Sequence, residues 1–590
     1  MMIIHRDATW PTTPVFGRER PARWPWCRAR FTGLLLALGA GAFHAAGAAP
    51  NGSSEASLAL FAQSAPAAGP APMPAAQRRA QQDAAAPVLQ AWQLPELRSL
   101  SRAALDALVQ PWLGQPFGLA EQQALRKAVL TELDARGLGL GGVAVRPVPG
   151  QSGRWALLVV EPRLRRIDYT PGVAVPLTDA SVTALLEAQG LRSGELLDLR
   201  ALDQALYRLN DLPGISATAT LAPSGEEGVY DLLIERSLRR RFEGSAELDN
   251  HGSRYNGRYR LGGLVRINEP LDLGDNLDAR LLVSDTAGLV SARLGYELPL
   301  AWPGVGDQVG WDSGWRVGLG LSSLSYELGD SFAAMQAHGR ALVSDLSFTR
   351  PLLRSRRGNL IGRLGASSRR LHDRFDALAL QIDKRASDLS AALSFELRDD
   401  FAGGGYNGGS LALASGRLHI DSALAQAEDS ALGPRATQGR YLKVTAQLSR
   451  LQALPWVGWS TYAGLSAQWA DRNLDASDKF ALGGAAAVRA YAPGEASADR
   501  GFVTSLELRR AIGARWSVFG LFDAGHAVLQ SRPLAGADNI RNLSGLGLGA
   551  FFSDPALFTL RTVLAWQLAG SPQSEAAGSA RLNLQITRGF

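Results

Sequence analysis

The carboxyl-terminal part of the chain, residues 238–590, alternates apolar and polar positions in segments of about ten residues. Residues 315–322, 442–449 and 558–568 are three clear examples. Segments with one apolar and one polar face predict the strands of a membrane β-barrel, whose apolar face meets lipid and whose polar face meets water inside. Strands of a soluble β-sandwich alternate too, but they are shorter.

About sixteen such segments can be counted from Arg241 to Phe590, and an even number is what bacterial barrels have. An even count returns both ends of the barrel to the same side of the membrane, so the preceding residues are expected there. The last segment, residues 581–590, ends in the aromatic residue Phe590. The sequence therefore predicts a transmembrane antiparallel β-barrel.

A helical period is found only before the barrel, in two consecutive segments of the same order. Residues 88–162 predict β-α-α-β-β, with the first helix capped by Ser101. Residues 163–237 predict the same order again, with helices capped by Asp179 and Asp198. Two units of about 75 residues form an internal α+β repeat.

The amino-terminal residues have the composition of a targeting segment and a linker. Residues 1–48 combine a basic stretch, an apolar stretch and an Ala-Gly-Ala cleavage site, which predicts a secretory signal peptide. Residues 49–87 are rich in Pro and Ala and predict a linker, in which residues 54–63 and 75–85 could form helices. The sole cysteine, Cys27, lies in the signal peptide, so no disulfide is expected after cleavage.

Charge and motifs argue against several classes of function. The formal charge of +6 is largely due to the arginines of residues 1–48, so the rest of the chain lacks the basic surplus of a nucleic-acid-binding protein. None of the four lysines follows a glycine, so there is no P-loop. The residues 137–142 match G-x-G-x-x-G but follow a helix, which is the reverse of the dinucleotide-binding order. We therefore expect no enzyme activity, no metal and no cofactor.

The stretch at residues 480–500 is rich in Gly and Ala and lies between two predicted strands, so it predicts a long loop. Long loops of this kind are usually functional. Arg489 at its centre is flanked by small residues and can reach a carboxylate. Asp523, which follows Arg489 by 34 positions across one predicted strand, offers that carboxylate.

The motif residues of this loop and of the following strand resemble those of a known family. Gly-Gly followed by Val-Arg-Ala-Tyr, and then Phe-Asp-Ala-Gly, are similar to the VRGY loop and the xDxG strand motif of two-partner secretion (TpsB-type) outer-membrane transporters. The two repeats resemble POTRA domains, and Phe590 resembles the terminal signal for barrel assembly. The site residues that the resemblance implies are Gly483, Gly484, Val488, Arg489, Ala490 and Tyr491 in the loop, Phe522, Asp523 and Gly525 in the wall, and Phe590.

The resemblance implies α+β periplasmic repeats followed by a barrel in the outer membrane of a Gram-negative bacterium, with residues 478–500 folded inward. It implies export of a large TpsA-like exoprotein, haemolysin-like or adhesin-like, that is recognised by its amino-terminal secretion domain and needs no ATP. It also implies the barrel-assembly machinery and outer-membrane lipid as partners. Whether residues 49–87 form a plug helix or only a linker stays open. Two alternatives are a barrel-assembly factor and a passive porin.

Three further expectations concern energetics and binding. The family has Gly where this chain has Ala490, which would cost on the order of 1 kcal/mol if the position required a positive φ. The pair of Arg489 and Asp523 is expected to lie in a wet lumen, where exposed pairs contribute about 0–1 kcal/mol. The last strand of each repeat is expected to leave a free edge that can capture an extended peptide.

Overall fold

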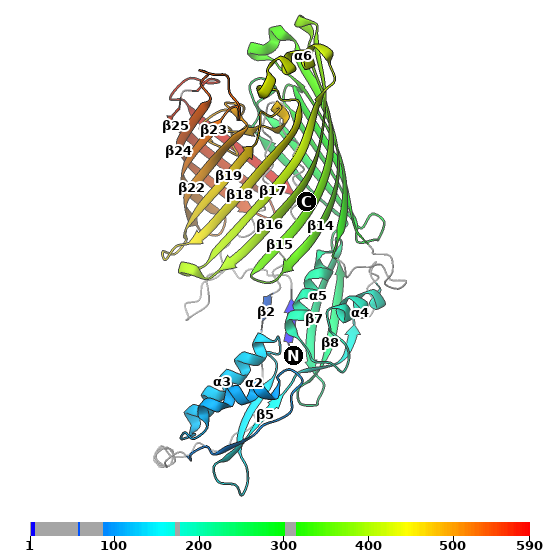
Figure 1. Cartoon of the computed structure of the whole chain (residues 1–590), viewed down its shortest axis with the longest axis vertical. Helices are drawn as coiled ribbons and strands as arrows, with labels where there is room; N and C mark the ends of the chain where they lie inside the picture. Colours follow the sequence, from blue (N-terminus) through cyan, green and yellow to red (C-terminus); the bar gives the residue numbers. More distant parts are fainter. Residues whose placement is uncertain (1, 6–56, 60–86, 171–177, 301–313, 571) are drawn as a thin grey trace. The chain divides into compact units, whose positions relative to one another are not determined.

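Over its described residues, the computed structural model (Figure 1) divides into two compact units, one ending at Arg239 and the other beginning at Arg240. Most of the predicted signal peptide, and the predicted helical piece at residues 75–85, lie outside the described residues. The residues that the structure describes are 2–5, 57–59, 87–170, 178–300, 314–570 and 572–590.

The first repeat of the amino-terminal unit has the predicted order of elements. They are β3 (Ala91–Gln93), α2 (Arg102–Val109), α3 (Leu119–Ala135), β4 (Gly142–Pro147) and β5 (Arg154–Val160), with the short 3₁₀ helix η2 (Gln110–Trp112) after α2. The strands pair in the order β3-β5-β4. Ser101 caps α2 as predicted, because its side chain accepts a hydrogen bond from the backbone N–H of Ala104. Leu105, Leu125 and Leu157 are buried between the helices and the sheet.

The second repeat has the same order and a core of its own. Its elements are β6 (Arg163–Tyr169), α4 (Asp179–Ala188), α5 (Leu199–Asp211), β7 (Ile215–Pro223) and β8 (Val229–Leu238). Asp198 caps α5 as predicted, but the prediction that Asp179 caps α4 is wrong. Thr178 occupies that position, since its side chain accepts a hydrogen bond from the backbone N–H of Ser181.

The edges of the two sheets differ from the prediction. The last strands, β5 and β8, are central strands with neighbours on both sides, so neither leaves a free edge. The sheet of the second repeat runs β2-β1-β7-β8-β6, and its edge at β7 pairs with β1 (Met2–His5), which in turn pairs with β2 (Ser57–Ala59). Residues 57–59 are thus a strand, whereas a helix was one possibility for this stretch.

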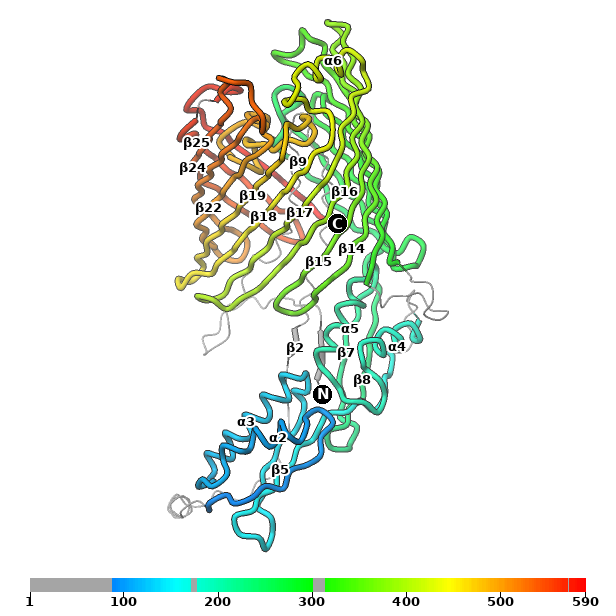
Figure 2. Tube along the Cα trace, in the orientation of Figure 1, coloured from blue at the N-terminus to red at the C-terminus, as the bar shows by residue number. Residues whose placement is uncertain are grey.

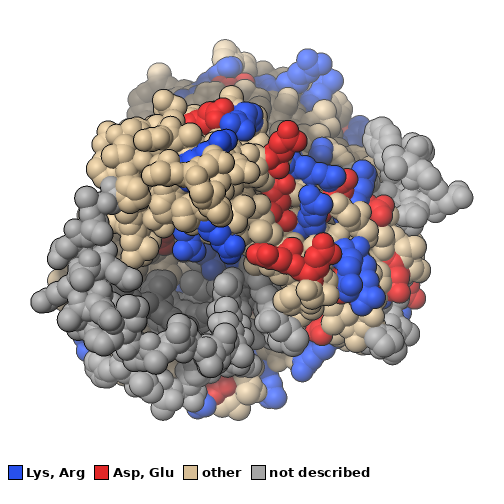
Figure 3. Space-filling model, turned by 90° about the horizontal axis from the view of Figure 1, so that it is seen from below, with Lys and Arg blue, Asp and Glu red and all other residues tan. Residues whose placement is uncertain are grey.

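Charged residues are interspersed on the face of the molecule that Figure 3 presents. Over its described part, acidic and basic side chains alternate in small groups and form no continuous patch of one sign. A nucleic-acid-binding surface is usually a continuous basic stripe. The described part of the visible face shows no such stripe.

The second unit contains a closed antiparallel β-barrel of sixteen strands, the number predicted (Figure 2). Each strand pairs with its neighbour in sequence, and β26 pairs with β9 to close the barrel. The strands are β9 (Phe242–Asp249), β10 (Arg260–Asn268), β11 (Asn276–Ser284), β12 (Leu289–Pro299), β13 (Arg316–Glu327), β14 (Ala337–Arg354), β15 (Gly358–Phe375), β16 (Leu380–Asp399), β17 (Gly405–Ile420), β18 (Gly439–Ala453), β19 (Trp459–Ala470), β22 (Arg500–Ile512), β23 (Trp516–Val528), β24 (Ile540–Asp554), β25 (Phe558–Ala569) and β26 (Ala580–Gly589).

The two faces of the barrel wall have different chemistry, as the alternation predicted. Leu319 and Leu321 on β13 are among many exposed apolar side chains of the outer face. Arg293 on β12 instead forms a fork with Asp345 on β14, over 2.8 and 3.0 Å. Within the described residues, no helix has the length and apolar character needed to cross a membrane. Apolar side chains outside and ion pairs inside fit a barrel surrounded by lipid.

Candidate functional site: the inward loop

Residues 471–499, which connect β19 to β22, are called here the inward loop. Its two limbs form a short antiparallel hairpin of β20 (Phe480–Ala481) and β21 (Ser497–Ala498). The turn beyond the hairpin is tight, because Gly484 has a φ of +109° and a Cβ atom at Gly483 would lie 2.3 Å from the carbonyl oxygen of Ala492. Both predicted loop glycines are therefore demanded by the backbone.

Arg489, near the tip of the inward loop, contacts the carboxylate of Asp523 on β23. Its Nε atom donates to Asp523 Oδ2 over 2.8 Å, its Nη2 atom donates to Oδ1 over 2.6 Å, and its backbone N–H donates to Oδ2 over 3.1 Å. Such a bidentate contact fixes the orientation of the guanidinium group in addition to pairing the two charges. The contact predicted from the two motifs is thus present in the structure.

Glu507 on β22 is a second carboxylate at this place, and it was not predicted from the motifs. It accepts a hydrogen bond from Arg489 Nη1 over 2.5 Å, and it forms ion pairs with Arg509 and Arg561 over 2.6 and 3.2 Å. We call these four residues and Asp523 the tip cluster. The alternation of β22 contained the signal, because Glu507 lies between two exposed leucines and its side chain must therefore point inward.

The centre of the tip cluster is removed from solvent. The side chains of Arg489, Glu507 and Asp523 are 5%, 1% and 1% exposed. Burial opposes the charged guanidinium, but the hydrogen bonds and charges of the two carboxylates outweigh it and raise the pKa of Arg489. The expectation of an exposed pair in a wet lumen is therefore wrong, because the inward loop covers its own charges.

Two further wall strands, β26 and β25, bind the loop at the backbone of Arg489 and at the side chain of Tyr491. Asn583 Nδ2 on β26 donates to the carbonyl oxygen of Arg489 over 3.0 Å. The hydroxyl of Tyr491, whose side chain is fully buried, donates to the carbonyl oxygen of Ala569 over 2.8 Å. The loop tip is consequently fixed at several points along β22, β23, β25 and β26.

The inward loop packs where the wall has no side chains. A Cβ atom at Gly525 would lie 2.6 Å from Leu482 Cδ1 and 3.1 Å from Val488 Cγ2, and one at Gly545 would lie 2.6 Å from Ala490 Cβ. Gly525 belongs to the predicted motif, whereas Gly545 on β24 was not predicted. Ala490 does not have a positive φ, so the backbone strain that a positive φ would cause at this residue does not arise. Its methyl group is instead accommodated by Gly545.

The remaining predicted residues lie elsewhere in the wall. Phe522 is 37% exposed and shares the outward face of β23 with other apolar side chains, so it does not take part in the tip cluster. Phe590 is 59% exposed and exchanges two backbone hydrogen bonds with Gly244 on β9, over 3.0 and 3.1 Å. It therefore lies at the seam that closes the barrel.

Exchange of two side chains tests the packing of the tip. Gly545→Ala should push Ala490 away from the wall, at a cost of about 1–3 kcal/mol for overpacking, and should raise the rate of tryptic cleavage after Arg489 roughly tenfold. Adding Ala490→Gly should restore most of the protection, since it removes the opposing methyl group. The rate is measured on folded barrel in detergent, with Ala490→Gly alone as control. Unchanged cleavage in Gly545→Ala would contradict the packing.

Among the residues that the structure describes, no three His, Cys, Asp or Glu side chains are grouped so that they could hold a metal ion. The chemistry of the site is that of charge pairing and backbone hydrogen bonds. Such an arrangement can hold a loop in place and release it.

Comparison with known proteins places this architecture in a family. The profile described as haemolysin secretion/activation protein ShlB/FhaC/HecB matches residues 228–552. The heme/hemopexin transporter protein HuxB of Haemophilus influenzae (strain 86-028NP) is 26% identical over 373 residues, which are 62% of this chain and 63% of HuxB. The outer membrane transporter CdiB of Escherichia coli O6:K15:H31 is 26% identical over 437 residues, which are 72% of this chain and 68% of CdiB. This chain thus matches just under two thirds of the length of HuxB.

Solved structures agree with the fold. CdiB from Escherichia coli superposes with a TM-score of 0.65 at 18% identity, covering 87% of this chain and 96% of that protein. CdiB from Acinetobacter baumannii superposes with a TM-score of 0.59 at 17% identity, covering 86% and 90%. Since the family profile covers more than half of the sequence, the chain belongs to the ShlB/FhaC/HecB family of haemolysin secretion/activation proteins.

Proposed function

We propose that this chain is an outer-membrane pore that exports a large partner exoprotein from the periplasm to the cell surface without ATP. The observation that carries the proposal is the buried contact of Arg489 with Asp523 and Glu507, which fixes the inward loop within a closed barrel. Family membership supports it, as do HuxB and CdiB, both of which are named transporters.

The tip cluster has a positional role in this proposal. It holds the loop where an exported chain passes, and the loop must shift when that chain enters. Phe590 acts at a different stage, as the signal by which the barrel-assembly machinery inserts this protein. The proposed transport loop consists of Gly483, Gly484, Val488, Arg489, Ala490 and Tyr491, and its wall partner is the motif of Phe522, Asp523 and Gly525.

Deletion of the protein tests the function. Cells that encode a long, repeat-rich exoprotein beside this chain should lose that exoprotein from the medium when the chain is removed, and regain it on complementation. If the chain were a barrel-assembly factor, other outer-membrane barrels would decline as well. If it were a passive porin, only the uptake of small solutes would change, and export would continue.

The two repeats are proposed to bind the partner before it enters the barrel. Strand addition needs a free sheet edge. The backbone of β7 accepts an added strand in this structure, with Met2 opposite Leu221 and Ile4 opposite Ala219. If residues 1–48 are removed as a signal peptide, this edge becomes available to an extended segment of the exoprotein.

Residues 88–236, expressed alone, are expected to bind the unfolded amino-terminal segment of the exoprotein with a dissociation constant of about 1–100 μM, weak enough for release. Each repeat has its own buried core, which favours folding of this fragment. Titration calorimetry measures the affinity, and a scrambled peptide of equal composition is the control. Lack of binding, together with export by a barrel without the repeats, would contradict this role.

A further inference from the structure

The first limb of the inward loop carries two aspartates that meet basic side chains of the wall. They lie at and just before the short 3₁₀ helix η8 (Ala476–Asp478). Asp478 Oδ1 accepts a hydrogen bond from Lys443 Nζ on β18 over 2.6 Å, and its Oδ2 accepts one from Arg369 Nη2 on β15 over 2.8 Å. Asp475 Oδ2 accepts one from Lys384 Nζ on β16 over 2.8 Å. We call these five residues the stem cluster.

The stem cluster is buried like the tip cluster. Asp478, Lys443 and Arg369 are 2%, 2% and 4% exposed. Only four lysines occur in the whole sequence, and two of them, Lys384 and Lys443, belong to this cluster. Buried charges of this kind are strongly destabilising when one partner is lost, so they rarely lie together without a structural or functional reason.

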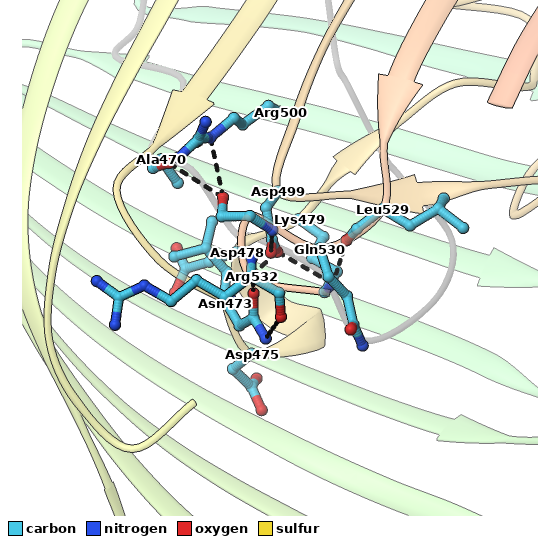
Figure 4. A network of polar contacts seen from close by, with 12 residues as sticks. Ala470, Asn473, Asp475, Asp478, Lys479, Asp499, Arg500, Leu529, Gln530 and Arg532 are labelled. Atoms are coloured by element: carbon cyan, nitrogen blue, oxygen red, sulfur yellow. Dashed lines mark hydrogen bonds and ion pairs between the residues drawn. The ribbon is translucent and has the colours of Figure 1, made fainter. Parts of the chain in front are cut away.

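Hydrogen bonds and one ion pair hold the same limb to Asp499, at the end of the loop; Figure 4 shows Asp499 and Lys479 among these residues. Asp499 accepts hydrogen bonds from the backbone N–H groups of Leu474 and Ser531, over 3.0 and 2.7 Å, and pairs with Lys479 over 3.0 Å. Lys479 Nζ also donates to the carbonyl oxygen of Leu529 over 2.8 Å. The base of the loop therefore has hydrogen bonds and an ion pair of its own, none of which involves a residue of the tip cluster.

The two clusters share no residue and use different parts of the wall. The stem cluster binds β15, β16 and β18, whereas the tip cluster lies on β22, β23 and β25. None of the wall contacts of Asp475 and Asp478 involves Arg489 or Asp523. Contacts with no shared partner are expected to contribute independently to the free energy that keeps the loop inside.

We propose that the stem cluster is a second latch, which fixes the base of the inward loop to β15–β18 and must be released in addition to the tip cluster before the lumen opens. The inference rests on the proposed function of the barrel as a pore. Lys384, Lys443 and Arg369 are positioning residues in this scheme, because they act through Asp475 and Asp478. Release of the tip alone frees only the segment beyond the β20–β21 hairpin.

The test measures the open fraction of the purified full-length protein in planar lipid bilayers, without any partner. Four proteins are compared: wild type, Asp475→Asn with Asp478→Asn, Arg489→Ala, and all three changes together. Asp421→Asn is the matched control, because it removes the ion pair of Arg385 with Asp421 beside the same strand β16 but outside the inward loop. Equal amounts of heat-modifiable, folded barrel are used throughout.

Each latch variant is expected to raise the ratio of open to closed protein on the order of 100-fold, and the combined variant is expected to raise it by about the product of the two single effects. The control should match wild type. A combined variant no more open than the larger single effect, or an unchanged open fraction in the stem variant, would overturn the proposal.

If the variant with both asparagines assembles poorly, Asp475→Asn alone serves instead, since Lys384 is 15% exposed and its loss of a partner is milder. It should still raise the open fraction above that of Asp421→Asn, and equality of the two would overturn the proposal. Failure of the proposed export is distinguishable, because absence of exoprotein transport by wild type leaves the conductance result unaffected.

Discussion

Arg489→Ala is expected to lower export of the partner exoprotein on the order of 100-fold while the barrel assembles in normal amount. The substitution removes the side-chain hydrogen bonds to Asp523 and Glu507, and bonds to charged groups contribute about 1.5–3 kcal/mol each. A loss of about 3 kcal/mol in loop anchoring corresponds to roughly that factor. Barrel assembly should survive because the wall is held by its continuous strand ladder. Asp523→Ala is expected to behave alike.

The measurement is the amount of exoprotein in the medium divided by the amount of folded barrel in the membrane. Arg450→Ala is the matched control, because Arg450 on β18 makes a similar fork to Asp399 on β16 over 2.7 and 3.0 Å and does not belong to the tip cluster. Export near the wild-type level in Arg489→Ala, or an equal loss in the control, would show that the contact is not specific to transport.

Glu507→Gln is expected to reduce both export and barrel stability. Glu507 pairs with Arg489, Arg509 and Arg561, so the variant takes this carboxylate from Arg509 and Arg561 and leaves Arg489 with Asp523 alone. Removal of one member of a buried charge cluster costs about 3–5 kcal/mol. The uncharged amide keeps the shape of the side chain, so the loss is one of charge and not of packing.

The temperature at which the folded form is lost on unheated gels should fall in Glu507→Gln, with export lowered on the order of 100-fold if about 3 kcal/mol is lost. Adding Arg561→Gln should recover part of the stability, because it removes one of the like charges that Glu507 held together. A melting temperature and an export level equal to those of wild type in Glu507→Gln would contradict this account. They would show that hydration stabilises the charges of Arg509 and Arg561 without Glu507.

Much of the fold was predictable because its elements have strong periodic signals. A barrel wall separates lipid from water, so each strand must alternate, and sixteen segments could be counted from this pattern. Local capping was predictable at Ser101 and Asp198 but wrong by one residue at Asp179, since Thr178 is also a capping residue. Strand order within the repeats was not predictable, because pairing of β8 between β6 and β7 is a tertiary property.

The candidate site was predictable only where motifs named it. Arg489 and Asp523 carry the two motifs, and their contact followed from them. Glu507 and Asp478 could be placed on the inward side or in the loop, but many inward positions of a barrel carry charges. The sequence alone does not indicate which of those charges meet. Asp478 and Lys443 lie 35 positions apart, and they meet only because β18 pairs with β19 and the loop after β19 folds back on the wall.

The double substitution Arg489→Ala with Asp523→Ala tests the central claim most directly. The quantity measured is exoprotein in the medium per folded barrel, in wild type, both single variants and the double variant. If the two residues act as one contact, the double variant should export as much as the single variant that exports less. Losses that multiply in the double variant would contradict the account, because they would show that Arg489 and Asp523 contribute to export separately.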